Sequence, residues 1–156
     1  MRGLLGPRGD AADPLHAPFR PRRGPRVAWV VGALALAGSV FLAVAVPGPV
    51  VLADRAGFVL FGLAVAWFLH RQATVAAVPS AQGLLVRNLV VRRQLEWAEI
   101  VDVRFGGGRP WVQLDLSDGG TLAVMGVQRA DGPWAEGEAR RLATLVELHT
   151  RTEHDR

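Results

Sequence analysis

The chain has 156 residues, of which 50% are apolar, and carries 18 basic residues, 14 acidic residues and no cysteine. The absence of cysteine excludes disulfides, thiolate metal sites and thiol catalysis. The formal net charge of +4 is concentrated in residues 1–26, which hold six Arg and two Asp, whereas residues 71–156 hold eleven charges of each sign. Because the expected folded part has no net positive charge, we do not expect it to bind nucleic acid.

Residues 1–26 also contain five of the ten prolines and four glycines. A segment of this composition cannot bury a core of its own. We therefore expect residues 1–26 to be a disordered Arg/Pro-rich tail.

The next segment, Val27–Val46, has twenty residues and no charge. At about 1.5 Å rise per residue, twenty helical residues cover roughly 30 Å, the thickness of the hydrocarbon layer of a bilayer. Backbone groups in lipid must be paired within the segment, so a spanning run of this length is a helix. We predict that Val27–Val46 crosses a membrane.

A second apolar segment, at about residues 50–69, follows Pro47-Gly48-Pro49 and carries Asp54 and Arg55 near its start. Its uninterrupted apolar part, Ala56–Leu69, is short enough to be a buried core helix instead. We favour a second span, since Asp54 and Arg55 can lie at the interface, where an arginine side chain can snorkel. The Pro-Gly-Pro sequence supplies a reversal, so residues 27–71 are predicted to form a two-helix transmembrane hairpin.

The distribution of positive charge predicts the orientation of this hairpin. Six arginines precede the first span, and His70 and Arg71 follow the second. By the positive-inside rule, both termini are cytoplasmic and the protein lies in the cell (inner) membrane. A cleaved secretory signal is the competing interpretation, because Ala43-Val44-Ala45 resembles a cleavage site. The first apolar run is too long for such a signal and a second one follows it, which disfavours cleavage.

Several pairs of small residues lie at a spacing that allows close packing of membrane helices. They are Ala28/Gly32, Ala35/Ser39 and Gly62/Ala66. Chance pairing in an alanine-rich segment is the alternative explanation.

After Arg71 the apolar residues change to strand patterns. Residues 73–78, 83–88, 90–95, 101–105, 112–116 and 121–127 read as short β-strands, several with alternating apolar and polar residues. Period-two alternation is typical of half-buried antiparallel strands. The sequence Ser117-Asp118-Gly119-Gly120 predicts a hairpin turn between the last two strands.

The last element is predicted to be a helix. Asp131-Gly132-Pro133 supplies a cap and a proline for the first turn. An apolar stripe with helical spacing then consists of Ala135, Ala139, Leu142, Val146 and His149. One amphipathic helix after a series of short strands predicts a curved sheet closed at one end by that helix.

These residues carry a resemblance to a known family. The pattern is Gly83-Leu84…Val86-Arg87-Asn88, Trp97-x-Glu99-Ile100, Leu114-x-Leu116…Asp118-Gly119 and Val127-Gln128…Asp131-Gly132. Over about residues 73–148 it resembles the bacterial PH domain of small two-span membrane proteins, in particular the low-molecular-weight-antigen PH-domain group. The resemblance implies an α+β domain over residues 72–150, a PH-like split β-barrel of antiparallel strands capped by the C-terminal helix, with residues 151–156 as a tail. It supplies no catalytic or ligand residues.

The candidate binding residues are Arg87, Asn88, Arg92 and Arg93, which cluster around the first predicted bend. Arginines at such a bend could bind phosphate oxygens of anionic lipid headgroups. An ordinary salt-bridged surface is the alternative, because Glu96, Glu99 and Asp102 are close in sequence. Trp97 is interpreted as an anchor of the core, since an indole buries a large apolar area.

No residue pattern indicates catalysis, a metal site or a cofactor. The four histidines lack ligand spacing, and Gly106–Gly108 lacks the following helix of a phosphate-binding loop. We therefore expect a non-enzymatic module, held at the cytoplasmic face of the membrane, that mediates protein interaction or assembly. The alternatives are an anionic-lipid headgroup sensor that uses Arg87, Arg92 and Arg93, or an accessory subunit of a membrane complex. The expected partners are the lipid bilayer and a protein.

Overall fold

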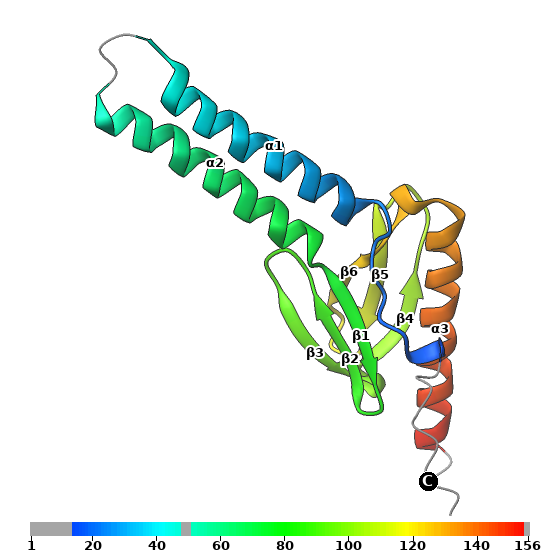
Figure 1. Ribbon diagram of the computed structural model, residues 1–156. Helices are drawn as coiled ribbons and strands as arrows, with labels where there is room; N and C mark the ends of the chain where they lie inside the picture. Colours follow the sequence, from blue (N-terminus) through cyan, green and yellow to red (C-terminus); the bar gives the residue numbers. More distant parts are fainter. Residues whose placement is uncertain (1–13, 48–50, 155–156) are drawn as a thin grey trace, which may run out of the picture.

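A computed structural model of the chain describes residues 14–47 and 51–154. Two long helices, α1 (Gly24–Ala45) and α2 (Leu52–Ala73), lie side by side and project away from a domain of strands and one further helix (Figure 1). Both helices extend beyond the predicted spans at their domain ends, α1 by three residues and α2 by four. Of the predicted Pro-Gly-Pro reversal, Gly48 and Pro49 lie outside the described residues.

The two long helices pack through small side chains. The buried residues of α1 are Ala28, Gly32, Ser39 and Ala43, and that of α2 is Gly62. A Cβ atom on Gly62 would lie 2.6 Å from the Ser39 Cβ, and one on Gly32 would lie 3.8 Å from the Ala66 Cα. The predicted small-residue pairs therefore lie where the two helices meet, and their size sets how closely the backbones approach.

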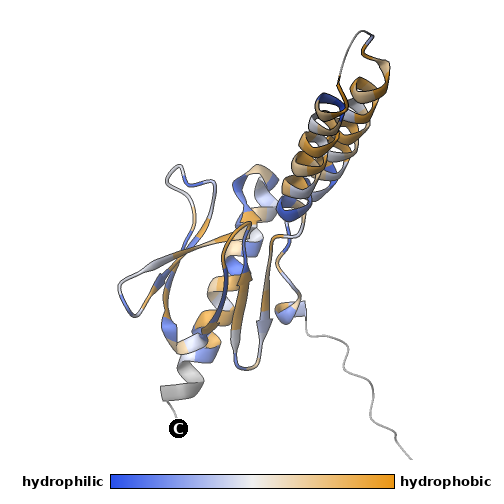
Figure 2. Cartoon of the chain, turned by 90° about the vertical axis from the view of Figure 1, so that its left-hand side faces the viewer, coloured by the Kyte–Doolittle hydropathy of each residue, from blue (hydrophilic) through white to orange (hydrophobic). Residues whose placement is uncertain are grey.

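Most residues of the hairpin are hydrophobic, with hydrophilic residues near its ends (Figure 2). Large side chains such as Leu34, Phe41, Leu60 and Phe61 are each at least 65% exposed. Both helices are long and apolar enough to cross a membrane. Near the far end, the Arg55 guanidinium donates a hydrogen bond to the Ala43 carbonyl across the hairpin, at 2.8 Å.

The domain contains two three-stranded antiparallel sheets and a C-terminal helix, which confirms the predicted fold class. The first sheet has the order β1-β2-β3 and the second β4-β5-β6. The elements are β1 (Ala76–Ser80), β2 (Gly83–Arg87), β3 (Arg92–Glu96), β4 (Ile100–Arg104), β5 (Trp111–Leu116), β6 (Thr121–Gln128) and α3 (Pro133–His154). Of the predicted C-terminal tail, residues 151–154 continue α3, and residues 155–156 lie outside the described part.

A single core fills the space between the sheets and α3. Its fully buried members include Leu84, Leu95, Leu114 and Leu142, one or more from each sheet and one from α3. Trp97 is buried, as predicted, and its Nε1–H donates to the Ser80 carbonyl at 3.0 Å. This hydrogen bond satisfies the polar atom of the indole and links the end of β1 to the end of β3.

The prediction of disorder over residues 1–26 is wrong for residues 14–26, and residues 1–13 lie outside the described part. Residues 14–16 form a short 3-10 helix, and Phe19 is fully buried in the core of the domain. The N–H and C=O of Phe19 both pair with Ala77 of β1, at 2.8 and 3.0 Å. The composition of the segment only shows that it cannot fold alone; the sheets supply the core that it lacks.

Asp131 has a different partner from the predicted one. Pro133 begins α3 as expected, but the Asp131 carboxylate accepts hydrogen bonds from the backbone N–H groups of Arg22 and Arg23, at 3.0 and 3.2 Å. These residues lead directly into α1, where unpaired N–H groups and the helix dipole favour a carboxylate. The carboxylate thus ties the domain to the start of the helical hairpin.

Candidate functional site

The four predicted binding residues lie on the β2–β3 hairpin, beside the end of α2 (Figure 1). Arg87 pairs with Arg92 in the strand register, and the Asn88 N–H closes the turn on the Val91 carbonyl at 2.8 Å. Sequence reasoning therefore placed these residues on one hairpin correctly. Their side chains, however, do not meet in one pocket.

The Asn88 side chain is committed to the fold. It is 7% exposed, its Nδ2 donates to the Ala123 carbonyl at 2.7 Å, and its Oδ1 accepts the Met125 N–H at 3.1 Å. Both partners are backbone groups of β6, which belongs to the other sheet. Asn88 therefore joins the two sheets at this end and has no polar atom turned towards a ligand.

The three arginines differ in their surroundings. The Arg87 Nε donates to the Thr74 carbonyl at 3.0 Å, just after α2. Arg93 Nη2 lies 3.6 Å from an Asp118 oxygen and 4.0 Å from a Glu99 oxygen, in half-exposed pairs that contribute less than about 1 kcal/mol. Arg92 is exposed, and no carboxylate among the described residues lies within ion-pairing distance of it. The anion-binding hypothesis remains a prediction, and Arg92 is the residue with most freedom to act in it.

The turn of this hairpin carries a feature that sequence reasoning missed. Arg71, in the last turn of α2, donates from Nε and Nη2 to the Leu89 carbonyl, at 3.2 and 2.7 Å. Val90, the next residue, is 82% exposed and Val91 is 49% exposed. An apolar pair at a hairpin turn, where polar residues are usual, was the available sequence signal.

A groove between β4 and α3 is the second candidate site. Its volume is about 600 Å³, and its apolar lining includes Val103 and Phe105 from the strand side and Ala139 and Ala143 from the helix. Charged residues from α3 and the preceding turn, Arg129, Glu136 and Arg140, also line it. β4 is an edge strand of its sheet, and Val101 on it is 67% exposed. The groove therefore lies beside a strand that has a neighbour on one side only.

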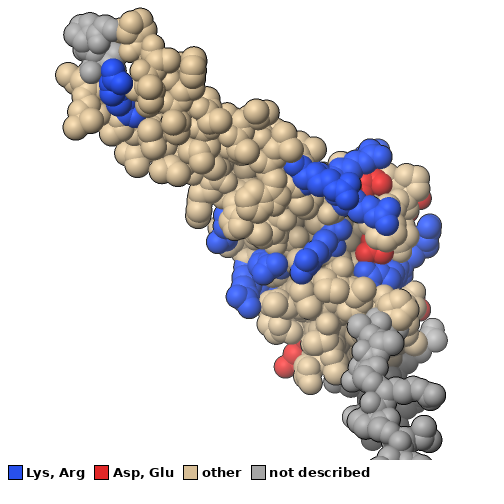
Figure 3. All heavy atoms as spheres, in the orientation of Figure 1, with Lys and Arg blue, Asp and Glu red and all other residues tan. Residues whose placement is uncertain are grey.

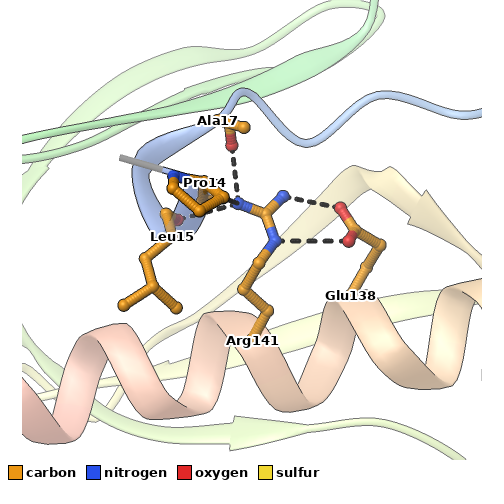
Figure 4. Close-up of polar contacts among 5 residues, drawn as sticks. All are labelled: Pro14, Leu15, Ala17, Glu138 and Arg141. Atoms are coloured by element: carbon orange, nitrogen blue, oxygen red, sulfur yellow. Dashed lines mark hydrogen bonds and ion pairs between the residues drawn. The ribbon is translucent and has the colours of Figure 1, made fainter. Parts of the chain in front are cut away.

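The corresponding space beside β1 is already filled by residues 14–23 of the same chain. The Arg141 guanidinium lies between Glu138 and the carbonyls of Leu15 and Ala17, each carbonyl at 2.8 Å (Figure 4). The same guanidinium lies 3.8 Å from the centre of the Phe19 ring. The domain thus holds an extended segment by a backbone pair, a buried aromatic side chain and a cation against that ring.

Within residues 14–47 and 51–154, no cluster of three or more His, Asp or Glu side chains has an arrangement that could hold a metal ion. The ring of His149 in α3 stacks on the buried Trp97 ring, with the ring centres 4.4 Å apart.

Comparison with known proteins places this arrangement in a family. A family model described as a bacterial PH domain matches residues 74–144. An uncharacterized protein of Mycobacterium bovis is 32% identical over 105 residues, which are 67% of this chain and 68% of the relative. The chain belongs to the bacterial PH-domain family.

Uncharacterized proteins from two strains of Mycobacterium tuberculosis show the same identity and coverage as the M. bovis relative. No solved structure matches the chain significantly. The matched residues of this bacterial PH domain run from the end of α2 into α3, so they contain both the β2–β3 hairpin and the β4–α3 groove. The resemblance inferred from the sequence is confirmed, and it gives these two surfaces a fold but no ligand.

Proposed function

We propose that this bacterial PH-domain protein is a non-enzymatic membrane adaptor, which spans the inner membrane through α1 and α2 and presents a protein-binding groove at the cytoplasmic face. The single observation that carries the protein-binding role is the open groove beside the edge strand β4. An edge strand offers backbone N–H and C=O groups to an extended partner, and an adjacent groove can select its side chains. PH-domain families are generally non-catalytic, in agreement with this role.

The contacts of Phe19 support this mode of binding. At β1 the fold already accepts an extended segment through two backbone hydrogen bonds and one buried aromatic ring. The β4–α3 groove has the same components, namely a strand edge, an apolar floor and flanking charges. We expect its partner to be an extended segment with an apolar side chain that reaches Phe105 and Ala139, flanked by charged residues.

The surface of the hairpin supports the membrane span. Large exposed apolar side chains along two long helices are costly in water and favourable in lipid. Exposed arginines gather where the hairpin meets the domain, and one lies near its far end, with uncharged surface between them (Figure 3). Because arginine-rich flanks stay in the cytoplasm, we assign the start of α1 and the end of α2 to that side.

The topology can be tested with single-cysteine variants, because the natural chain has none. Val51→Cys, near the far end of the hairpin, should react with an impermeant thiol reagent in intact cells. Ala81→Cys, in the exposed β1–β2 turn, should react only after lysis. Labelling of Ala81→Cys in intact cells would overturn the orientation.

The protein-binding role can be tested by photo-crosslinking in cells from three single positions. A photoreactive residue at Val101 in β4 should give a defined crosslinked product, which is lost when Ala143→Trp fills the groove. Asp118, in the exposed β5–β6 turn, is the control. A product from Leu34 on the helix surface instead of Val101 would favour the alternative, a subunit of a membrane complex joined through the helices. No product at Val101 would refute the groove as a binding site.

The headgroup-sensor alternative has less support. A headgroup site needs several converging donors, but Asn88 is buried and Arg93 faces Asp118 and Glu99. What remains on that hairpin is an exposed arginine pair and an apolar turn.

A further inference from the structure

The β2–β3 turn has two properties that rarely occur together in a water-exposed hairpin. Its apolar residues are largely open to solvent, Val90 at 82% and Val91 at 49% exposure. The turn is also held in place, because the Asn88 side chain bonds to β6 and the Leu89 carbonyl accepts two hydrogen bonds from Arg71. The exposed valines are therefore held in a fixed position. Their exposure to water costs free energy, which contact with an apolar environment would remove.

The position of the turn indicates that this apolar environment is the membrane. Arg71 belongs to the last turn of α2, and its guanidinium lies 5.8 Å from the ring of Trp67, which is exposed on the same helix. Tryptophan side chains at the ends of membrane helices lie at the level of the headgroups. Since Arg71 also holds Leu89, the β2–β3 turn lies at that level, alongside the end of α2 (Figure 1).

The charges around the turn fit the same surroundings. Arg87 and Arg92 face each other across the hairpin directly behind the turn, and both are exposed. The nearest carboxylate along the hairpin is Glu96, at the other end of β3. An apolar tip with arginines behind it matches the layers of a bilayer interface, where acyl chains lie below the phosphates.

We propose that the β2–β3 turn inserts Val90 and Val91 into the interfacial layer of the membrane, as a third attachment point beside α1 and α2. Arg87 and Arg92 then lie among the phosphates of anionic lipids. A third attachment point beside the two helices restricts the tilt of the domain on the membrane, so the β4–α3 groove keeps one orientation. The proposal rests on the membrane span of the proposed function.

The test uses the full chain in nanodiscs that contain phosphatidylcholine and phosphatidylglycerol, with one environment-sensitive fluorophore on a single cysteine. At Val90→Cys we expect a blue-shifted emission and quenching by lipids that carry a spin label near the headgroup. Ala81→Cys, in the turn at the opposite end of the same sheet, is the matched control and should show neither effect. Leu60→Cys, on the outer surface of α2, should be quenched by a spin label deep in the acyl chain.

These three positions separate failure of the proposal from failure of the span. Quenching at Leu60 with none at Val90 would overturn the interfacial attachment and leave the span intact. Absence of quenching at Leu60 as well would overturn the span. A blue shift at Val90 without quenching by any spin-labelled lipid would mean that protein covers the turn, which also overturns the proposal.

A second set of variants tests the chemistry of the attachment. With the fluorophore on Val91→Cys, the additional change Val90→Asp should reduce quenching to the level of the Ala81→Cys control. Arg87→Gln combined with Arg92→Gln should reduce quenching in anionic nanodiscs and have a smaller effect in pure phosphatidylcholine. Equal quenching in all these variants would overturn the proposed roles of the valine pair and the two arginines.

Discussion

The guanidinium of Arg141 lies 3.8 Å from the centre of the Phe19 ring, and this contact joins α3 to a segment that precedes the first long helix. The Asp131 carboxylate makes a second connection of this kind with Arg22 and Arg23. The Arg22 guanidinium also lies 3.6 Å from the centre of the Trp134 ring. Both ends of the helical hairpin are therefore attached to the domain, α2 by direct continuation into β1 and α1 by residues 14–23.

Phe19→Ala should destabilise the domain by about 3–5 kcal/mol, the usual cost of removing a fully buried phenylalanine side chain. The midpoint of thermal unfolding of the purified full chain in detergent measures the effect. Phe41→Ala is the matched control, because Phe41 lies on the outer surface of α1 and is 68% exposed. Equal shifts for the two variants would mean that Phe19 is not part of the core.

A soluble fragment of residues 72–156 should be less stable than the domain in the full chain, since it lacks Phe19. A synthetic peptide of residues 14–23, added in trans, should raise its unfolding midpoint. Saturation to about a hundred times the dissociation constant would give roughly 2.7 kcal/mol. A peptide with Phe19→Ala should have no effect, and stabilisation by both peptides would contradict the specific role of the ring.

Gly126→Ala should destabilise the domain by about 1–3 kcal/mol, as overpacked core positions do. A Cβ atom at Gly126 would lie 2.7 Å from the Phe19 carbonyl oxygen and 3.0 Å from the Ala77 nitrogen. It would therefore force apart the backbone pair that holds the N-terminal segment on β1. Chemical denaturation of the Gly126→Ala variant and of the parent chain measures the difference in the free energy of unfolding.

The control for this substitution is Gly137→Ala in α3, where a Cβ atom would meet nothing within 4 Å. An alanine in place of glycine within a helix adds about 0.5–1 kcal/mol of stability. The same glycine-to-alanine substitution should thus lower the stability at Gly126 and raise it at Gly137. A stabilising effect at Gly126 would show that β6 does not approach the N-terminal segment so closely.

Gly62→Ala should separate α1 from α2, because its Cβ atom would lie 2.6 Å from the Ser39 Cβ. The unfolding midpoint of the full chain in detergent should fall, and Ser39→Gly in the same chain should restore it by removing the opposing Cβ. Gly57→Ala, with open space around it, is the control. Rescue by Ser39→Ala, which keeps the Cβ, would contradict the steric explanation.

Asn88→Ala should cost about 1–3 kcal/mol, because the Met125 N–H loses its partner in the part-buried space between the sheets. Arg92→Ala should leave the stability nearly unchanged, since the Arg92 side chain is exposed and has no ion pair among the described residues. Urea unfolding of the two variants separates a structural residue from a surface residue. If Asn88→Ala left the stability unchanged, Asn88 would again be a candidate binding residue.

Elements whose signals are local follow from the sequence alone. The uncharged run at Val27–Val46 predicts a long apolar helix, and alternation around Val112 and Leu114 predicts strands, because side-chain periodicity reflects which face is buried. The motifs from Gly83 to Gly132 also identified the family. The candidate arginines were placed on one hairpin correctly for the same reason, since a short turn keeps neighbours in sequence close in space.

Contacts between residues far apart in the chain became known from the three-dimensional structure. Phe19 lies in a Pro- and Arg-rich segment that has no core of its own, and its place is set by Arg141 and Ala77, which are distant in sequence. Asn88 reads as a polar turn residue until β6 is brought beside it. Burial and hydrogen bonding depend on which surfaces meet, and local sequence patterns do not show this. The packing of the two sheets and the helical hairpin determines which residues come into contact.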